Sequence, residues 1–406
     1  MSTLAHQARR TIDQVDVAHA TVLVRVDFNV PLQEGSIADD TRIRAALPTI
    51  ESILERGGRV VLMSHLGRPG GKGHEPEFSL EPAATRLAEL LGRPVAFPSN
   101  DCTDDDARRA VAGMADGDVV LLENLRFHPG EKKGDASFAG ILVAGVDAYC
   151  NDAFGTAHRS DASMVATPTA MGDRPCVAGR LLERELRYLG ETIAAPERPF
   201  VAILGGAKVS DKLKTIRRLA GVVDTLVVGG AMAFTLLKAK GCAVGRSLVE
   251  SDMVEEAGRM IEEVAASSTT LLLPSDFVCG AEPKAGTPTS ISGTEIPDDM
   301  MGLDIGPESA ERFAETVRAA RTVVWNGPMG LFEVAPFDQG TRTVAEALAA
   351  ATEAGGTTIV GGGDTASAVQ GMGFGERVSH VSTGGGASLT MLEGGPMPAV
   401  EALDAT

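Results

Sequence analysis

Basic side chains gather where the predicted strands in the first half of this 406-residue chain end. They are five arginines and two histidines, each at or just after a strand end: Arg25, Arg42, His65, Arg68, Arg126, His158 and Arg159. Arginine binds carboxylate or phosphate through two parallel hydrogen bonds, so this set suits a small polyanion. One arginine alone would more often form a surface ion pair, but five at successive strand ends favour a site. Asp27 and Asn29 could bind substrate hydroxyls or orient the arginines.

Glycine-rich turns take the equivalent positions in the second half. Residues 205–212 follow a predicted strand and are expected to open a helix, with Lys208 and Lys212 one turn apart against one phosphate chain. Three similar turns are residues 229–232, 361–365 and 384–388. One such turn is weak evidence, because glycine also permits tight packing of a strand on a helix. Four of them, with two lysines and with Asp364 and Thr365 suited to a metal-bound phosphate, favour a nucleotide polyphosphate.

The elements that must position these residues alternate between strands and helices. Short runs that are apolar on both faces predict parallel strands covered by helices on each side. These runs begin at Thr21, Arg59, Asp118, Pro199, Asp224, Thr269, Arg321 and Thr357, and one more strand reaches Asn151. Helical patterns cover residues 40–55, 80–91, 254–266, 307–319 and 338–351. The fold class expected is α/β, with two doubly wound, Rossmann-like lobes that contain parallel sheets and are joined by a hinge helix.

The hinge helix is expected at residues 180–195, an amphipathic stretch that Pro196 and Pro199 bring to an end. The amino-terminal lobe would then cover residues 1–179 and the second lobe residues 196–394. Ligands of open α/β sheets bind at the carboxyl ends of the strands. The arginines and histidines would therefore serve one lobe, and the glycine turns and lysines the other.

Composition excludes several other classes of protein. A net charge of −18 and an aromatic content of 4% argue against a nucleic-acid partner. A hydrophobic content of 44% excludes a disordered chain. The most apolar stretch, residues 225–237, is too short to span a membrane, and the amino terminus has no secretory signal. Five scattered cysteines, without the spacing of a metal site, indicate reduced thiols and a cytoplasmic location.

The positive charge consists of 28 arginines and nine lysines. Two interpretations of this acidic, lysine-poor composition stand side by side. One is solvation in concentrated salt, and the other is the arginine bias of a GC-rich genome. A salt series of the activity distinguishes them.

Several well-known catalytic motifs are missing from the sequence. There is no GxxxxGK[ST] phosphate loop and no GxGxxG followed by an acidic residue about twenty positions on. The HRD and DFG motifs of protein kinases, the GxSxG motif and the HExxH motif are also missing. P-loop NTPases, dinucleotide-dependent dehydrogenases, serine hydrolases and zinc peptidases of these types are therefore disfavoured.

The order of the remaining motifs closely resembles the phosphoglycerate kinase family over nearly the whole chain. The matching segments are VRVDFNVPL at Val24, SHLGRP at Ser64, ENLRFHPGE at Glu123, NDAFGTAHR at Asn151, GGAKVSDK at Gly205, VVWNGPMGLFE at Val323, GGGDT at Gly361 and STGGGAS at Ser382. The resemblance implies reversible phosphoryl transfer between 1,3-bisphosphoglycerate and ADP, giving 3-phosphoglycerate and ATP with Mg²⁺. It also implies that residues 395–406 pack back on the amino-terminal lobe and that the protein is a monomer.

The resemblance assigns the phosphoglycerate to the amino-terminal lobe. Asp27 and Asn29 would hold the glycerate with Arg25, and Arg42 would be a catalytic arginine at the carboxyl end of the substrate. The other residues implied for this substrate are Phe28, His65, Leu66, Gly67, Arg68, Arg126 and Arg159.

The resemblance assigns the nucleotide to the second lobe. Lys208 would stabilise the phosphoryl group in flight, Glu333 would bind the ribose, and Asp364 would ligate Mg²⁺. The other nucleotide-binding residues implied are Gly206, Lys212, Gly306 as part of the adenine pocket wall, Asn326, Pro328, Gly362, Gly363 and Thr365. Gly384 and Gly385 would present N–H groups to the transferring phosphoryl. Ala231 stands where the family usually has glycine, which leaves the nucleotide preference open.

Two other classes of function compete with this interpretation. Another kinase that makes an acyl phosphate, such as an acetate or amino-acid kinase, would not need five strand-end arginines. A two-lobed binding protein with a hinge would not need Lys208, Asp364 and repeated glycine turns. Because two substrates on two lobes must be brought together, we also expect hinge closure.

Overall fold

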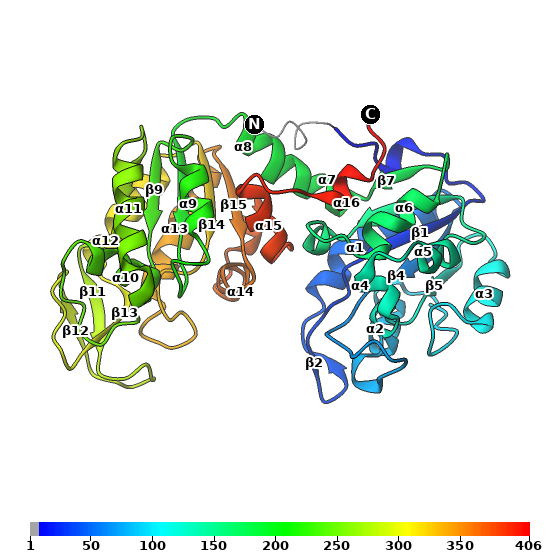
Figure 1. Ribbon diagram of the computed structural model, residues 1–406, viewed down its shortest axis with the longest axis horizontal. Coiled ribbons are helices and arrows are strands. Elements are labelled where there is room, and N and C mark those ends of the chain that lie inside the picture. Colours follow the sequence, from blue (N-terminus) through cyan, green and yellow to red (C-terminus); the bar gives the residue numbers. More distant parts are fainter. Residues whose placement is uncertain (1–7) are drawn as a thin grey trace. The chain divides into compact units, whose positions relative to one another are not determined.

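The computed structural model describes residues 8–406 and divides the chain into two compact units (Figure 1). Unit 1 runs to Arg187 and also includes Gly395–Thr406, whereas unit 2 comprises Tyr188–Gly394. Each unit is built around a parallel sheet with helices packed on it, so the predicted α/β class with two lobes is confirmed. Within residues 8–406, no helix combines the length and the apolar character needed to cross a membrane.

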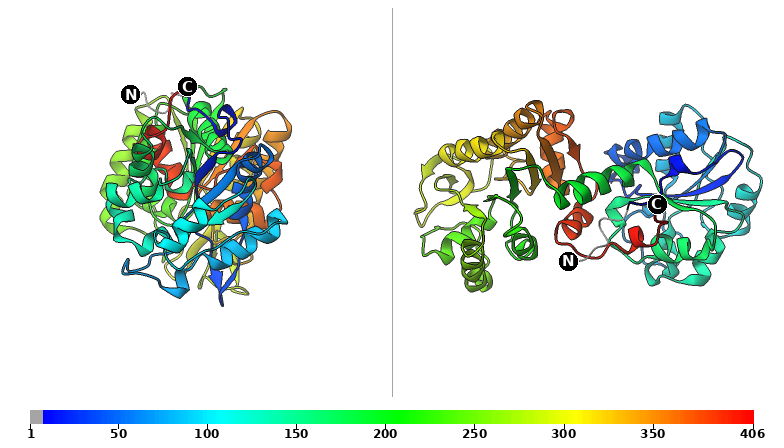
Figure 2. Two further views of the ribbon diagram at one scale, coloured as in Figure 1. Left: turned by 90° about the vertical axis from the view of Figure 1, so that its right-hand side faces the viewer. Right: turned by 90° about the horizontal axis from the view of Figure 1, so that it is seen from above.

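Unit 1 contains a five-stranded parallel sheet in the order β5-β4-β1-β6-β7. Its strands are β1 (Thr21–Val26), β4 (Arg59–Met63), β5 (Val119–Leu121), β6 (Ala148–Asp152) and β7 (Cys176–Ala178). All six residues of β1 are buried, because helices cover both faces of the sheet (Figure 2). The register places Arg25 beside Met63 and Asn151, so the segments after these three strands meet at one edge of the sheet.

The helices of unit 1 carry the apolar faces that close its core. They are α1 (Thr41–Glu55), α2 (Glu81–Leu91), α3 (Asp105–Ala112), α4 (Pro129–Lys133), α5 (Ala136–Leu142), α6 (Thr167–Ala170) and α7 (Arg180–Glu185). Ile43, Ile50 and Ile53 of α1 and Leu87 of α2 pack with Val24 and other strand residues in one buried cluster. Shorter elements of this unit are η2 (Ile12–Gln14), β2 (Leu32–Gln33), β3 (Ser36–Ile37), η3 (Pro76–Phe78), η4 (Leu125–Phe127), η5 (Phe154–Thr156) and the π-helix η6 (Ala162–Ala166).

Unit 2 contains a six-stranded parallel sheet in the order β10-β9-β8-β14-β15-β16. The strands are β8 (Phe200–Leu204), β9 (Thr225–Val228), β10 (Thr270–Leu272), β14 (Thr322–Asn326), β15 (Thr357–Gly361) and β16 (His380–Val381). The helices are α9 (Leu213–Leu219), α10 (Met232–Ala239), η8 (Ser251–Met253), α11 (Val254–Ala265), α12 (Pro307–Arg318), α13 (Gln339–Glu353), α14 (Gly363–Gly371), η9 (Gly375–Arg377) and α15 (Gly385–Leu392). Trp325 on the central strand β14 is fully buried against α12 and α13.

A second, antiparallel sheet in unit 2 was not predicted. It consists of β11 (Phe277–Gly280), β12 (Thr289–Ser292) and β13 (Met301–Ile305), in the order β12-β11-β13. The outer strand β12 is short, polar and exposed, so it lacks the buried apolar run that marks the other strands. Phe277 of β11 packs against Phe234 of α10, with ring centroids 4.8 Å apart.

The predicted helix at residues 180–195 is present and contains an irregular middle turn. It begins as α7, continues as a π-helix over Leu186–Glu191 (η7), and ends as α8 (Thr192–Ala194). The boundary between the two units, after Arg187, lies within η7. A π-turn weakens the regular hydrogen-bond ladder of a helix, so this is the place where the helix bends most readily.

The carboxyl-terminal tail, which includes α16 (Pro398–Glu401), is bound to unit 1 by hydrogen bonds. The N–H of Cys176 donates to Asp404 Oδ2 at 3.0 Å, and the N–H of Asp404 donates to the Cys176 carbonyl at 2.8 Å. Arg9 donates to the carbonyl oxygen of Leu403 at 2.9 Å. The N–H of Ala399 donates to the carbonyl of Ala157 at 3.2 Å, so the tail reaches the segment that precedes Arg159.

The fully buried carboxyl group of Asp152 accepts hydrogen bonds from the first turn of α7. Asp152 Oδ1 accepts from the N–H groups of Leu181 and Leu182 at 2.9 and 3.2 Å, whereas its Oδ2 has no hydrogen-bond partner among residues 8–406. Burial raises the pKa of Asp152 to about 7, and the Thr49 side chain and the two N–H donors oppose that rise only in part.

We predict that Asp152→Asn changes how stability depends on pH. The folded-state pKa of Asp152 is raised, so the folded protein binds a proton more tightly than the unfolded chain, and stability is lost as the pH rises from about 4 through about 7. Asparagine keeps an oxygen for the two N–H donors and does not ionise. Urea unfolding at pH 5 and pH 8 should show that the variant gains up to about 2 kcal/mol relative to the wild type at the higher pH. An equal difference at both pH values would contradict the prediction.

Candidate functional site: an anion site in unit 1 and a nucleotide pocket in unit 2

The carboxyl end of β1 carries a buried carboxylate beside cationic side chains. Asp27 Oδ2 lies 3.4 Å from Arg42 Nη1, and Asp27 Oδ1 lies 3.7 Å from His65 Nδ1. Arg42 Nη1 also donates to the carbonyl of Asn29 at 2.8 Å, so this side chain in the first turn of α1 is held at two points. Burial alone would raise the pKa of Asp27, but neighbouring positive charges, Arg42 and Arg25 among them, hold the pKa below its usual value. Asp27 is therefore an anion that orients Arg42.

Arg25 is completely buried and supports this site from beneath. Its Nε donates to Ser163 Oγ at 2.8 Å, and that hydroxyl donates to Oε1 of the buried Glu131 at 2.6 Å. Its Nη2 lies 3.2 Å from His65 Nδ1. A guanidinium group only donates, so Nδ1 accepts and the proton of the neutral imidazole is on Nε2. Burial is the main cause that holds the pKa of His65 well below its usual value.

Arg126 is the cation in unit 1 that most clearly lacks partners. It is nearly buried, and its Nη1 donates to the carbonyl of Gly67 at 2.8 Å. Its Nη2 lies 3.6 Å from Asp161 Oδ2, which is too long for a hydrogen bond. Among residues 8–406, its Nε and Nη2 have no hydrogen-bond partner, and neither has His158 Nδ1. Buried donors of this kind indicate that an anionic ligand completes the network.

The remaining predicted residues of unit 1 form the loops around this cluster. Asn29 Oδ1 accepts from the N–H of Gly67 at 2.8 Å, and the N–H of Phe28 donates to Ser64 Oγ at 2.8 Å. Phe28 and Leu66 are buried and anchor these loops in the core. Arg68 and Arg159 are exposed, and the charge of Arg159 contributes to the lowered pKa values of Arg126 and His65, after burial. The structure thus brings the predicted cations together at one edge of the sheet.

Unit 2 contains a pocket of about 500 Å³ at the carboxyl ends of β8, β9 and β14. Gly206, Pro328, Glu333 and Asp364, all predicted for the nucleotide, are among the residues that line it. Ala231 lines it as well. Apolar side chains make up most of the rest of the wall: Phe234, Leu248, Phe277, Met301, Leu303, Ile305, Met329, Leu331 and Phe332. A largely apolar cavity of this size with a few polar groups suits a flat base attached to a polar chain.

Close approach of the backbone explains two of the glycines near this pocket. A Cβ atom on Gly205 would lie 2.2 Å from the carbonyl oxygen of Pro328, and one on Gly327 would lie 2.1 Å from the carbonyl oxygen of Gly205. The turns after β8 and β14 therefore touch through their main chains, and no larger residue fits at either position.

The predicted placement of the two lysines on one helical turn is wrong. Helix α9 begins only at Leu213, and Lys208 lies in the preceding loop, where Val209 is buried and Ser210 Oγ donates to Glu250 at 2.6 Å. Lys212 is buried, and its Nζ donates to Asn326 Oδ1 at 2.5 Å. Burial lowers the pKa of Lys212. Lys208 is exposed, so the two lysines have different surroundings.

Side-chain hydrogen bonds hold the turns after β14, β15 and β16, and one of these bonds couples the first two turns. Thr365 Oγ1 accepts from the N–H of Gly327 at 2.6 Å, which ties the first turn of α14 to the loop after β14. Asp364 is exposed in that same turn. Gly362 precedes the turn with a φ of 90°, and Gly363 is exposed at its start. At the start of α15, the N–H of Gly384 donates to Ser382 Oγ at 3.1 Å.

Comparison with known proteins agrees with this geometry. Residues 12–395 match the family model described as phosphoglycerate kinase. Relatives named phosphoglycerate kinase from Rhodopirellula baltica and Moorella thermoacetica are 56% and 52% identical, each over 98% of this chain and 99% of their own. The chain belongs to the phosphoglycerate kinase family.

Solved structures lead to the same conclusion. The phosphoglycerate kinase structures from Coxiella burnetii and Pyrococcus horikoshii superpose with TM-scores of 0.87 and 0.84, at 35% and 31% identity. Each covers 97% of this chain and 98% of its own. The predicted class of activity is thereby confirmed: the protein is a phosphotransferase, a kinase of glycolysis.

Some residues that line the pocket were missed, and several residues predicted for the nucleotide do not line it: Lys208, Lys212, Asn326, Gly362, Gly363, Thr365 and Gly306. Gly306 is not among the lining residues: its N–H donates to the carbonyl of Asp276 at 2.8 Å, and a Cβ would meet the Asp276 carboxylate at 2.2 Å. Asp304, two positions before, does line the pocket, and burial raises its pKa to about 8. Phe277 was missed because its sequence neighbourhood carries no motif, and Phe234 was missed although it lies two residues after the glycine turn at residues 229–232.

Ser163 links the buried Arg25 to Glu131 beneath the anion site, so we predict that Ser163→Ala destabilises the protein. Loss of the hydroxyl leaves the buried Arg25 Nε and Glu131 Oε1 without their shared partner, which should lower the free energy of unfolding by about 2–3 kcal/mol. Denaturant unfolding measures the difference. Ser160→Ala, an exposed serine of the same segment, is the matched control and should change stability little. An equal loss of stability in Ser163→Ala and Ser160→Ala would contradict the linking role of Ser163.

Proposed function

We propose that this phosphoglycerate kinase transfers the phosphoryl group directly between 1,3-bisphosphoglycerate and ADP, without a phosphorylated side chain. The ADP β-phosphate oxygen attacks phosphorus in line, the bond from phosphorus to the acyl oxygen breaks, and the carboxylate of 3-phosphoglycerate leaves. An acyl phosphate is a reactive donor, so the chain needs to supply only position and positive charge. The observation that carries the proposal is that two guanidinium nitrogens of the buried Arg126 in unit 1 have no hydrogen-bond partner among residues 8–406, together with a separate nucleotide-sized pocket in unit 2.

The anion site in unit 1 supports a binding mode for the phosphoglycerate. Arg126, with two free nitrogens, Arg159 and Arg68 suit the phosphate at the far end of the substrate. The Nε2–H of the neutral His65 adds one uncharged donor. Asp27 and Asn29 suit the glycerate hydroxyl and carboxyl region. Five arginines, Arg25 as a support among them, exceed what a carboxylate with only one anionic end requires, which disfavours an acetate or amino-acid kinase.

Arg42 is proposed as the catalytic arginine. Asp27 and the Asn29 carbonyl hold it at the edge of the site, and its side chain is about one third exposed at 36%. Its charge stabilises the carboxylate that forms as the acyl oxygen leaves. Because Asp27 and Asn29 fix the guanidinium beforehand, little reorganisation is needed during the reaction.

The pocket in unit 2 supports a binding mode for the nucleotide. The base would pack between the apolar side chains, Glu333 would bind the ribose, and Lys212 with Asn326 would reach the phosphates. Lys208, Gly384 and Gly385 would donate to the transferring phosphoryl group. Ala231 lines the same wall, so its methyl group contributes to the choice of base.

The residues present fit a nucleotide-bound Mg²⁺. Asp364 is an exposed carboxylate in the pocket wall, and Mg²⁺ is typically held by one or two carboxylates together with substrate phosphates. When bound there, Mg²⁺ neutralises phosphate charge. The finer properties proposed for the protein are a monomeric state, a cytoplasmic location and no nucleic-acid partner, the last supported by the net charge of −18.

The test is a coupled assay with Mg-ATP and 3-phosphoglycerate, in which NADH oxidation reports 1,3-bisphosphoglycerate. Lys208→Ala should lower kcat by about 100-fold or more with little change in KM, because its contact strengthens in the transition state. Lys214→Ala, an exposed lysine in the first turn of α9, is the matched control and should leave both constants unchanged.

Two results would contradict this assignment. An equal loss of affinity and turnover in Lys208→Ala would remove its transition-state role. No turnover from folded wild-type protein that still binds nucleotide would reject the substrate, and the other acyl-phosphate kinases would then be tested.

Direct transfer requires the two bound substrates to meet, which generates a prediction of domain closure about the helix at residues 180–194. Small-angle X-ray scattering should show a smaller radius of gyration with both substrates present than with either one alone. The π-turn at η7 is the expected place of bending. An unchanged radius with both substrates bound would contradict closure.

A further inference from the structure

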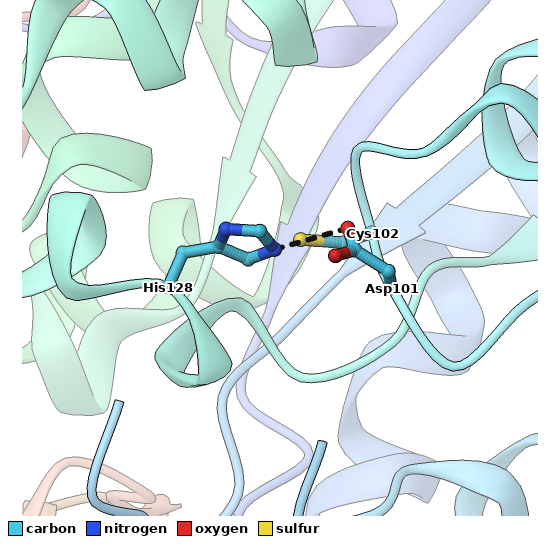
Figure 3. Close-up of side chains that lie close together, drawn as sticks. All are labelled: Asp101, Cys102 and His128. Carbon is cyan, nitrogen blue, oxygen red and sulfur yellow. Dashed lines mark hydrogen bonds and ion pairs between the residues drawn. The ribbon is translucent and has the colours of Figure 1, made fainter. Parts of the chain in front are cut away.

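Three side chains with different donor atoms converge in unit 1, away from the arginine cluster. Figure 3 shows Asp101, Cys102 and His128 together, with the imidazole facing the turn that carries the other two. The carboxylate oxygen, the thiol sulfur and the ring nitrogen all lie within 4.8 Å of one another. His128 Nε2 is 3.0 Å from Asp101 Oδ1.

Local structure holds each donor in place. Asp101 Oδ1 accepts from the N–H and the hydroxyl of Thr103 at 2.7 and 2.8 Å, which fixes the turn before α3. Cys102, within that turn, is buried. His128 stands at the start of α4, directly after η4, and its ring stacks on Phe138 with centroids 5.2 Å apart.

The three types of ligand atom indicate which class of metal ion would bind. Thiolate, imidazole and carboxylate are the ligands of Zn²⁺, whereas Mg²⁺ and Ca²⁺ prefer oxygen alone. Ligand bonds of roughly 2.0 to 2.3 Å in a tetrahedron place neighbouring donors about 3 to 4 Å apart. The nitrogen and oxygen already have that spacing, and the sulfur needs only a small side-chain shift.

Burial is the main cause that raises the pKa of the Cys102 thiol, which opposes the thiolate form that a metal requires, and the negative charges of Asp101, Glu131 and Glu123 raise it further. A divalent cation at this position would neutralise the same negative field.

We propose that Asp101, Cys102 and His128 form a binding site for Zn²⁺ or a similar thiophilic divalent cation, with water as the fourth ligand. Binding releases the thiol proton to solvent and leaves the oxidation state of the metal and sulfur unchanged. The ion joins the turn before α3 to the η4 loop, which carries Arg126 of the anion site. It therefore stabilises that loop. The inference is independent of the proposed reaction.

Co²⁺ is the probe, because a cobalt–thiolate bond gives a charge-transfer absorption band and Co²⁺ takes the geometry of zinc. Titration of the full-length wild-type protein should develop this band to one equivalent, and Zn²⁺ should then abolish it. Cys102→Ser should lose the band, and His128→Gln should weaken binding at least tenfold, since even outer-sphere ligand partners are worth that much. Cys242→Ser, which removes a half-exposed thiol elsewhere, is the matched control and should keep both band and affinity.

A second measurement guards against variants that fail to fold. Zn²⁺ should raise the Tm of the wild type and of Cys242→Ser, and at the same concentration should raise the Tm of Cys102→Ser and His128→Gln much less. No thiolate band in the wild type would overturn the proposal and leave an ordinary Asp101–His128 ion pair beside a buried thiol. A band that survives in Cys102→Ser would overturn it by placing the metal elsewhere.

Discussion

A guanidinium group without access to water organises the anion site. Arg25 is at the end of the central strand of unit 1 and is fully buried, so its charge must be matched inside the protein. Ser163 links it to Glu131, and its other side contacts His65. This contact fixes the tautomer of His65. Hydrogen bonds therefore hold the edge of the sheet in place without a ligand, as recognition of a small polyanion requires.

Unit 2 meets a different physical constraint. Its turns after β8 and β14 touch through their main chains, and the pocket beside them is lined mainly by apolar side chains, with Glu333 and Asp364 among the few charged groups. Lys212 is buried like Arg25, yet its partner is the neutral amide of Asn326. Its charge therefore remains available to a phosphate. In unit 1 the buried cation is linked to a carboxylate through Ser163 and serves as a support, whereas in unit 2 the buried cation has a neutral direct partner, and the charges of Asp211, Glu393 and Asp364 act on it without a direct bond.

The sequence sufficed for features that depend on local composition. Buried runs such as Thr21–Val26 identify central strands, and the residues after them follow from parallel topology. The sequence did not suffice where a contact between distant parts of the chain determines the local structure. Lys208 lies outside the helix because the hydrogen bond between Ser210 and Glu250 holds its loop. Gly306 packs against the carboxylate of Asp276 and does not line the pocket. The polar strand β12 has no apolar run to reveal it. Asp101 and His128 come from separate segments that meet only in the fold, so cysteine spacing could not indicate them.

The unsatisfied polar atoms connect folding to function. Within residues 8–406, several buried atoms without partners lie at or beside the two sites: Arg126 Nε and Nη2, Asp27 Oδ1, Asp161 Oδ2, His158 Nδ1 and Asn326 Nδ2. Each costs stability while it is unpaired, because water does not replace the missing bond in full. A ligand that supplies the missing partners returns this free energy as affinity. The fold tolerates such atoms because compensated charges lie close to them. One example is the buried Arg25, which Ser163 links to Glu131. The buried support and the buried unpaired atoms are therefore two parts of one arrangement, in which stability given up in the free protein is recovered on binding.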